Sequence, residues 1–425
     1  MLLLTVGAVI TLMLLGVPVA IALAATTIGF FAIEQIPIET FIQMVAKGVD
    51  SFTLLALPFF ILTGKLMNLG GATERIFRLG NASVGHIRGG MAHANVAASF
   101  LFAGISGSAV ADAGGLGAVE IETMRKAGYT EDFSVGVTAA SATIGPIIPP
   151  SVIMIVYGIA AGVPIGALFI GGIIPGTLMA LALMGTVAVI SRVSPVPEST
   201  AFSARALLLA IVRAGFALLT PAIIVLGILS GAFTVTESGA VAAAYSIVLG
   251  LFIYRELNLR SLWQAITESM VESAGILLII GVASGFAWMM SFQQAPQATI
   301  EGLLGLTQNP VVILLLLGFL YLVLGLFIEA IAIVTMTIPV VMPALKLVGI
   351  DPIHFGVILA VLMSIGTITP PLGIVMFTLC RIRNISIARF SRIIWPWLAV
   401  LIGVTVLLIL IPGLVTWLPR IAGLS

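Results

Sequence analysis

Long apolar runs without charge constrain this chain more than any other feature. Segments 2–33, 207–231, 311–327 and 399–410 are almost uncharged, as a helix that crosses the roughly 30 Å hydrocarbon core of a bilayer requires. Charged residues make up only 8% of the 425 residues, whereas a soluble domain carries about 25%. The sequence therefore predicts an all-α polytopic membrane protein, with 2–33 as a first, retained span.

The composition also argues against several classes of function. The single cysteine, Cys380, and three histidines without metal-ligand spacing exclude a cysteine-based metal or redox site and give no histidine site. A formal net charge of +1 gives no indication of nucleic-acid binding. Phosphate-loop, zinc-protease and nucleophile-elbow motifs do not occur in the sequence, so we expect that the protein is not an enzyme.

A motif that occurs twice divides the chain into two halves. The stretch TIGPIIPP at 143–150 matches SIGTITPP at 364–371, an offset of 221 residues (364 − 143). The same offset pairs Gly104 with Gly325 and Gly128 with Gly349. Self-similarity at one offset is the sign of an internal duplication. We predict two repeats, 1–190 and 232–425, joined by a linker and an unpaired helix at 191–231.

Charge predicts that the two repeats have opposite orientations. The loop 65–90 holds four basic residues, whereas its counterpart 286–311 holds none. The loop around 160–168 is uncharged, whereas its counterpart carries Arg381, Arg383, Arg389 and Arg392. Basic loops remain in the cytoplasm. We therefore expect inverted-topology repeats, with a cytoplasmic N-terminus and a C-terminus on the opposite side of the membrane.

Each predicted repeat contains a re-entrant helical hairpin and a broken transmembrane helix. The hairpins are expected at about 91–127 and 311–348, and the broken helices at about 130–162 and 353–380. Glycine and proline interrupt the helices, and irregular backbone at membrane depth is tolerated only inside protein or around a watery cavity. This arrangement is typical of secondary transporters.

Two further segments combine apolar and charged residues ahead of a span. Segments 35–50 and 256–270 are predicted as amphipathic helices at the membrane surface. Ordinary connecting helices remain the alternative.

Paired, interrupted helices indicate a transporter binding site near the membrane midplane. Free carbonyls suit a small hard cation such as Na+, and the N-termini of half-helices suit an anionic group. The first hairpin tip, 103–117, offers the hydroxyls of Ser106 and Ser108 and the carboxylate of Asp112. Close packing of small residues is the alternative role for this tip.

The second half is the more polar one at the corresponding positions. Glu329 of the second hairpin corresponds to Ser108 of the first. In the second broken helix, threonines stand where the first has Pro146 and Ile148. We therefore expect Thr367 and Thr369 to contact substrate directly.

At GISGSAVADAGGLGAVEIETMRKAGY (104–129), ATIGPIIPPS (142–151) and SIGTITPPLG (364–373), the sequence resembles the large membrane subunit (DctM/SiaM type) of tripartite ATP-independent periplasmic (TRAP) transporters. The resemblance covers essentially the whole chain. It implies a Na+-coupled importer of small carboxylates, such as sialic acids or C4-dicarboxylates, with an elevator-type fold like that of the ion-transporter superfamily. It also implies a bacterial cytoplasmic (inner) membrane, so that the predicted C-terminus would be periplasmic. It also implies two partners, a small four-helix membrane subunit, expected as a separate chain, and a periplasmic substrate-binding protein.

The resemblance implies at least two Na+ sites, one between each hairpin tip and the neighbouring broken helix. The candidate Na+ ligands are Gly104, Ser106, Ser108, Asp112, Gly145, Ile148 and Pro150 in the first half and Gly325, Gly366 and Thr369 in the second. The candidate substrate contacts are Pro146, Thr367, Thr369 and Pro370.

Other functions remain open from the sequence. A symporter of carboxylate and Na+ that needs no binding protein is one alternative, although the Ser-Asn-Thr hairpin signature of divalent anion:sodium symporters is absent here. A Na+/H+ antiporter would use Asp112 and Glu329 as carriers. A membrane assembly subunit that does not transport is a third alternative.

Overall fold

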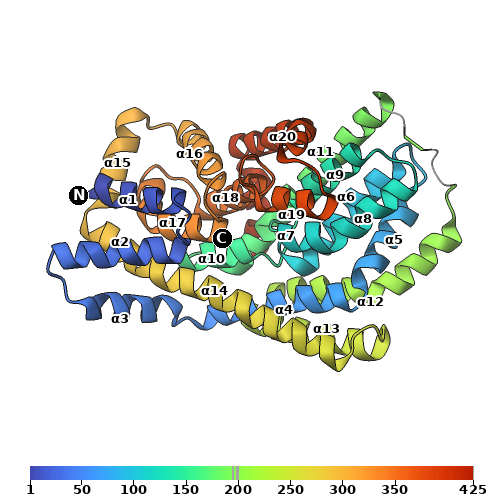
Figure 1. Cartoon of the computed structure of the whole chain (residues 1–425), viewed down its shortest axis with the longest axis horizontal. Coiled ribbons are helices and arrows are strands. Elements are labelled where there is room, and N and C mark those ends of the chain that lie inside the picture. The colour runs from blue at the N-terminus through green and yellow to red at the C-terminus, as the bar shows by residue number, and fades with distance from the viewer. Residues whose placement is uncertain (194–195, 198–200, 425) are drawn as a thin grey trace.

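Helices build the part of the chain that this computed structural model describes, residues 1–193, 196–197 and 201–424 (Figure 1). No β-strand occurs in these residues. Among them, seven helices are long and apolar enough to cross a membrane, or up to eight if one sharply bent pair counts as a single span. The predicted all-α membrane fold is confirmed. Part of the predicted linker, 194–195 and 198–200, lies outside the described residues.

The first apolar run is not one span, and that prediction is wrong. It forms two helices, α1 (Leu2–Leu14) and α2 (Val19–Ile33), which pack against each other. Gly16, with φ of +83°, and Pro18 interrupt the helix. Thirteen and fifteen residues reach only about 20 and 23 Å, less than the hydrocarbon core. The prediction that the N-terminus is cytoplasmic assumed that residues 2–33 cross the membrane once, so it loses this support.

A layer of long helices runs along one side of the molecule (Figure 1). It consists of α3 (Ile38–Val49), the 3₁₀ turn η1 (Phe52–Leu55), α4 (Ala56–Leu69), α13 (Val235–Val248) with the π-helical turn η3 (Leu249–Ile253), and α14 (Leu259–Phe292). The predicted surface helix 256–270 is not separate, because α14 continues without a break for 34 residues, about 51 Å. By contrast, α3 is a distinct amphipathic helix that packs on α14 through Phe41.

Two helix pairs end in short turns. The first comprises α6 (Gly90–Ser106), α7 (Ala109–Ala111), the π-helical turn η2 (Asp112–Leu116) and α8 (Gly117–Lys126). The second comprises α16 (Pro310–Gly325) and α17 (Ala330–Leu347). Below, the first tip means residues 106–111 and the second tip means residues 325–331. These segments coincide with the predicted hairpins.

Two helices are broken in the middle, within the predicted ranges. The first break, 143–151, separates α9 (Glu131–Ala142) from α10 (Val152–Ala161), and the second break, 367–373, separates α18 (Pro352–Gly366) from α19 (Ile374–Arg383). Side chains cap the helix starts: Ser151 accepts from the Met154 amide at 3.2 Å, and Asp351 accepts from the Ile353 amide at 2.8 Å. Each break contains a cis Pro–Pro bond.

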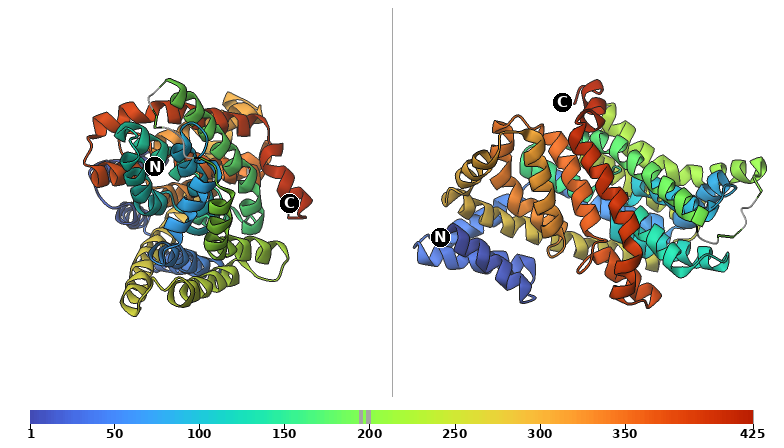
Figure 2. Two further views of the ribbon diagram at one scale, coloured as in Figure 1. Left: turned by 90° about the vertical axis from the view of Figure 1, so that its right-hand side faces the viewer. Right: turned by 90° about the horizontal axis from the view of Figure 1, so that it is seen from above.

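The remaining helices connect or enclose these elements. They are α5 (Ala72–Val84), α11 (Ile165–Val193), α12 (Ala204–Leu229), α15 (Ala295–Leu306), α20 (Ile387–Leu410) and α21 (Gly413–Ile421). Figure 2 shows the arrangement of these helices from the end and from above. In the broken helices, nine of the 12 residues of α9 and 14 of the 15 residues of α18 are buried.

One hydrogen bond joins the two breaks to each other. The Ser364 hydroxyl at the end of α18 donates to the Thr143 carbonyl at 2.5 Å, and the two residues are 221 positions apart. Both residues are fully buried. Because α9 has already ended at Ala142, the Thr143 carbonyl has no helical partner of the usual kind. The two halves of the chain are therefore tied together at corresponding positions.

We expect Ser364→Ala to lower stability measurably. The Thr143 carbonyl would lose its donor in a buried place, which costs about 1–3 kcal/mol. Ser273→Ala is the matched control, because the buried Ser273 hydroxyl donates at 2.7 Å to Ser269 within its own helix and only supplements a helical bond. Thermal unfolding in detergent should show a clearly larger drop in Tm for the Ser364 variant. Equal drops would contradict this role.

Candidate functional site

A cavity of about 700 Å³ lies where the two tips and the two breaks meet. Residues of both tips line it, together with Pro146 of the first break and Thr367 and Leu372 of the second. Its remaining wall comes mainly from α4 and α14, including Lys65 and Glu272. The cavity therefore lies between the broken helices and the layer of long helices.

Three helices begin at this cavity. The first turns of α10, α17 and α19 supply lining residues, among them Val152, Ala330 and Ile374. A helix N-terminus carries about half a positive charge and unpaired N–H groups. Three helix dipoles at one cavity favour an anionic group, and some of the end amides already have partners, since the Val375 and Met376 amides donate to the Thr367 carbonyl at 2.9 and 3.3 Å. Glu329 and Glu272 also line the cavity beside Lys65, so its charged side chains sum to −1 (1 − 2).

The first tip contacts the first break through backbone atoms. Gly107 has φ of +60°, and a Cβ atom there would collide with the Pro150 carbonyl oxygen. At Gly145, an added Cβ would lie 3.2 Å from both the carbonyl carbon and oxygen of Ser108. Glycine is required at Gly107 both for the left-handed conformation and for this close approach.

The second tip contacts the second broken helix in a similar way. A Cβ atom at Gly366 would lie 3.1 Å from the Gly325 carbonyl oxygen and 3.3 Å from its Cα. Because backbone atoms form this contact, they cannot rotate away as a side chain could. In both halves, therefore, a tip glycine meets the end of a broken helix.

The predicted site residues divide into two groups. Those that line the cavity are Ser106, Ser108, Pro146, Gly325, Gly366 and Thr367. Those that do not are Gly104, Asp112, Gly145, Ile148, Pro150, Thr369 and Pro370. Several of the second group still lie close by: Gly145 and Pro150 touch the first tip, and Gly104 approaches Pro221 of α12.

The hydroxyl groups of the site differ in their hydrogen bonding. The Ser106 hydroxyl is buried and has no partner among the described residues. By contrast, Thr367 donates to the Ser364 carbonyl at 2.6 Å and Thr369 donates to the Ile365 carbonyl at 2.7 Å. Ser106 is thus the hydroxyl most in need of a further ligand. Ile148 packs its side chain toward Gly176 of α11, so only its backbone remains for a ligand role.

Asp112 belongs to a separate buried cluster between α6, η2 and α9. Its Oδ1 accepts from Ser99 at 3.4 Å, and Ser99 contacts Ser141 at 3.1 Å. Asn95 extends the cluster by accepting from Ser141 at 2.8 Å and donating to Thr138 at 2.7 Å. Asp112 is 1% exposed and does not line the cavity, although its amide donates to the Ser108 carbonyl at 3.0 Å. Its side chain therefore belongs to the cluster and not to the cavity.

Three charged residues that were not predicted as site residues also lie at the cavity or are buried in α8. Lys65 forms ion pairs with Glu272 at 3.1 Å and Glu268 at 3.5 Å, and Lys65 and Glu272 line the cavity. Glu120 of α8 is fully buried, and neither oxygen has a partner among the described residues. The sequence could have indicated Glu120, because it follows Asp112 by about two helical turns. Nothing in the sequence indicates that Lys65 contacts α14.

A polytopic helical fold with an internal cavity at two helix breaks is typical of membrane transporters. The family model for the DctM component of tripartite ATP-independent periplasmic transporters matches residues 6–414. The chain therefore belongs to this family. It is a large membrane permease component of a transporter and not an enzyme.

Individual relatives agree with this assignment. The chain is 40% identical over 411 residues to the sialic acid TRAP transporter large permease protein SiaM of Vibrio cholerae, covering 96% of each chain. It is 38% identical over 376 residues to the C4-dicarboxylate TRAP transporter large permease protein DctM of Pseudomonas aeruginosa, covering 88% of each. In fold it is similar to the YdaH transporter of Alcanivorax borkumensis, with a TM-score of 0.60 at 21% identity, covering 88% of this chain and 87% of that one.

Proposed function

We propose that this chain is the Na+-coupled permease subunit of an importer for small carboxylates. The observation that carries the proposal is the convergence of the N-termini of α10, α17 and α19 on one cavity that both tips also line. Relatives named for sialic acid and for C4-dicarboxylates share one chemical group, the carboxylate. The carboxylate would accept hydrogen bonds from amides at these helix ends.

Na+ would bind between each tip and its break. On the first side, the free hydroxyl of Ser106 and the backbone carbonyls beside Gly145 and Pro150 offer uncharged oxygen ligands. On the second side, the carbonyls near Gly325 and Gly366 offer the same. Because a bound cation would hold each tip against its break, Na+ would order the helix ends that receive the carboxylate. Binding of Na+ and substrate would therefore be coupled.

The moving part would be the body formed by the tips and the broken helices. Its two halves are joined by the hydrogen bond from Ser364 to Thr143 and by the contact of α10 with α17. The layer of α3, α4, α13 and α14 would stay fixed in the bilayer. We propose that the first body slides along this layer in an elevator movement, with the cavity between them.

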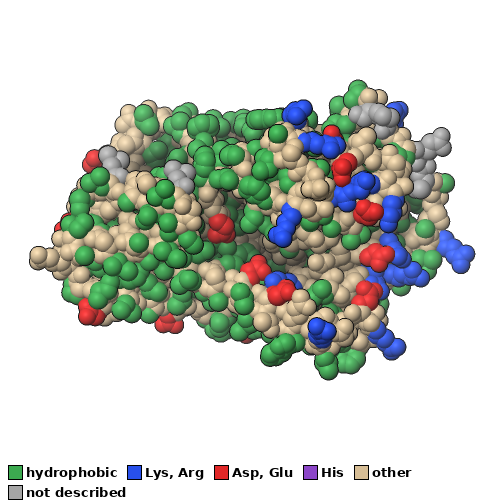
Figure 3. Space-filling view, viewed as in Figure 1, with side chains coloured by type: hydrophobic (Ala, Val, Ile, Leu, Met, Phe, Trp, Pro, Cys, Tyr) green, Lys and Arg blue, Asp and Glu red, His purple; other side chains and the backbone are tan. Residues whose placement is uncertain are grey.

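The orientation in the membrane follows from charge. Lysine and arginine gather at one end of the face in Figure 3, and we propose that this end is cytoplasmic, as basic residues favour. The N-terminus lies at the opposite end in the same view (Figure 1), so the proposal assigns it to the periplasm instead of the predicted cytoplasmic side. The C-terminus remains periplasmic. A separate small membrane subunit and a periplasmic binding protein would complete the transporter.

Replacing Ser106 tests the Na+ proposal. Ser106→Ala removes one of the few uncharged side-chain oxygens at the first tip. We expect the Na+ concentration for half-maximal uptake to rise about tenfold, because the loss of one polar contact costs about as much as the loss of one hydrogen bond. Uptake of a labelled carboxylate into proteoliposomes, with the binding protein and small subunit present, measures this. Ser83→Ala, at a serine whose hydroxyl donates to Leu79 within α5, serves as the control.

Two results would contradict the proposal. Uptake that is equal with and without Na+ would remove the coupling to Na+ altogether. An unchanged Na+ requirement in the Ser106 variant, with uptake otherwise normal, would remove Ser106 from the site but leave the coupling intact.

A further inference from the structure

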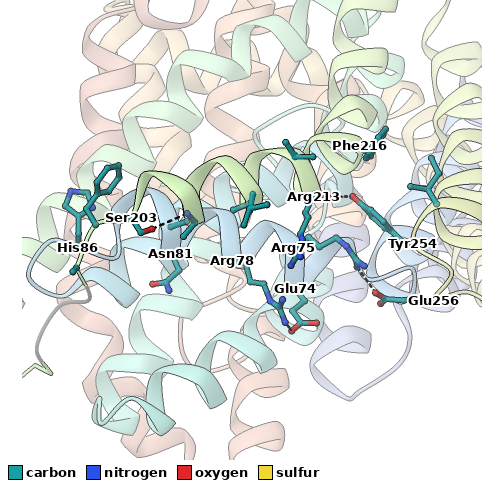
Figure 4. A pocket seen from close by; sticks show the side chains of 18 residues that line it. Glu74, Arg75, Arg78, Asn81, His86, Ser203, Arg213, Phe216, Tyr254 and Glu256 are labelled. Atoms are coloured by element: carbon teal, nitrogen blue, oxygen red, sulfur yellow. Dashed lines mark hydrogen bonds and ion pairs between the residues drawn. The ribbon is translucent and has the colours of Figure 1, made fainter.

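A second pocket, which shares no lining residue with the cavity at the tips, lies between α5, the start of α12 and the segment after η3 (Figure 4). Its volume is about 900 Å³. We call it the arginine pocket, because Arg75, Arg78 and Arg213 line it. None of its residues takes part in the proposed transport site.

The charges of the arginine pocket do not cancel. Arg75 pairs with Glu256 at 2.6 Å and lies 3.9 Å from the centre of the Tyr254 ring, while Arg78 pairs with Glu74 at 2.5 Å. No carboxylate partner of Arg213 occurs among the described residues. Three arginines and two glutamates line the pocket, which leaves a net charge of +1 (3 − 2). The pocket therefore suits a ligand with a single negative charge.

The walls of the pocket are partly apolar and accessible. Phe202, Leu209, Val212 and Phe216 line it and are 44–59% exposed. A fully water-soluble anion would gain nothing from such a wall, whereas an amphipathic one would bury apolar surface there.

The position along α12 fits the headgroup region of a bilayer. The pocket uses residues 203 to 216, the first half of a 26-residue helix that is long and apolar enough to span. It also lies at the end of the molecule where lysine and arginine gather (Figure 3). Basic pockets between helices at this depth are suited to anionic lipid headgroups.

We propose that the arginine pocket binds one phospholipid with a singly charged phosphodiester headgroup. The phosphate lies near Arg213 and Arg78, where guanidinium groups give charge-assisted hydrogen bonds. The acyl chains follow Val212 and Phe216. The lipid would then join α5 to α12 at the edge of the permease.

Native mass spectrometry of the purified full-length chain, with added phosphatidylglycerol, tests this. We expect wild-type protein to retain one phosphatidylglycerol and Arg213→Gln to bind it at least tenfold more weakly, as the loss of a charge-assisted hydrogen bond implies. Arg205→Gln is the matched control, because Arg205 is on the same helix but does not line the pocket. It should bind as the wild type does. Arg213→Lys should lie between the two.

Three outcomes would overturn the proposal. Equal weakening in the Arg213 and Arg205 variants would show that only general surface charge matters. Equal retention of phosphatidylcholine would remove the role of net charge. Complete displacement of phosphatidylglycerol by millimolar inorganic phosphate would indicate a site for the free anion instead. Unchanged Tm values across the variants would exclude misfolding as the cause.

Discussion

Gly107→Ala should reduce carboxylate uptake about 100-fold, whereas Gly162→Ala should leave it close to the wild-type level. Both glycines have positive φ, +60° and +67°, so both variants carry a similar backbone strain of about 1 kcal/mol. Only at Gly107 would the new methyl group collide with the Pro150 carbonyl oxygen. Overpacking against rigid backbone costs about 1–3 kcal/mol more, which would move the first tip away from its break.

The comparison of these two variants separates the effect of backbone strain at a positive φ from the effect of the collision with Pro150. Uptake into proteoliposomes measures function, and thermal unfolding in detergent measures stability. We expect similar Tm values for both variants, because the backbone strain is shared and the tip can move. If Gly107→Ala transports normally, the first tip does not need to close on the first break.

Gly366→Ala should reduce uptake about 10- to 100-fold, and Gly325→Ala should reduce it only a fewfold. The contact between the two residues is asymmetric: a Cβ at Gly366 meets the Gly325 carbonyl oxygen at 3.1 Å, whereas a Cβ at Gly325 meets the Met363 methyl group at 3.5 Å. A methionine side chain can rearrange, but a backbone carbonyl cannot. A misfit of 1–3 kcal/mol corresponds to this range of rates.

The Na+ dependence of the same variants gives a second measurement. Because the Gly325 carbonyl is an expected Na+ ligand, Gly366→Ala should also raise the Na+ concentration that supports half-maximal uptake. Equal losses in the two variants would mean that the size of residue 366 does not control the second tip.

These contacts suggest why glycine and proline occur together at the site. Proline ends the helices and leaves carbonyl groups free, while glycine lets a second segment approach those carbonyls closely. At the first site the carbonyl belongs to Pro150 and the glycine to the tip. At the second site the roles are exchanged, because the carbonyl belongs to Gly325 of the tip and the close glycine, Gly366, ends the broken helix.

Much of the architecture could be predicted from local sequence. The break between α9 and α10 lies within the predicted range because glycine and three prolines at 145–150 cannot continue a helix. The two helix pairs that carry the tips likewise lie within the predicted hairpin segments, about 91–127 and 311–348, to within one residue. By contrast, the division of 2–33 into α1 and α2 was missed, although Gly16 and Pro18 were visible, because hydropathy alone does not register a break.

Membrane location, the α-helical class and the positions of the breaks were determined by the sequence itself, since they depend on neighbouring residues along the chain. Only the tertiary structure decided that Asp112 lies apart from the cavity, that Lys65 of α4 meets Glu272 of α14, and that Ser364 bonds to Thr143. The physical reason is separation along the chain. These contacts join segments that are distant in sequence, and only the packing of whole helices brings them together.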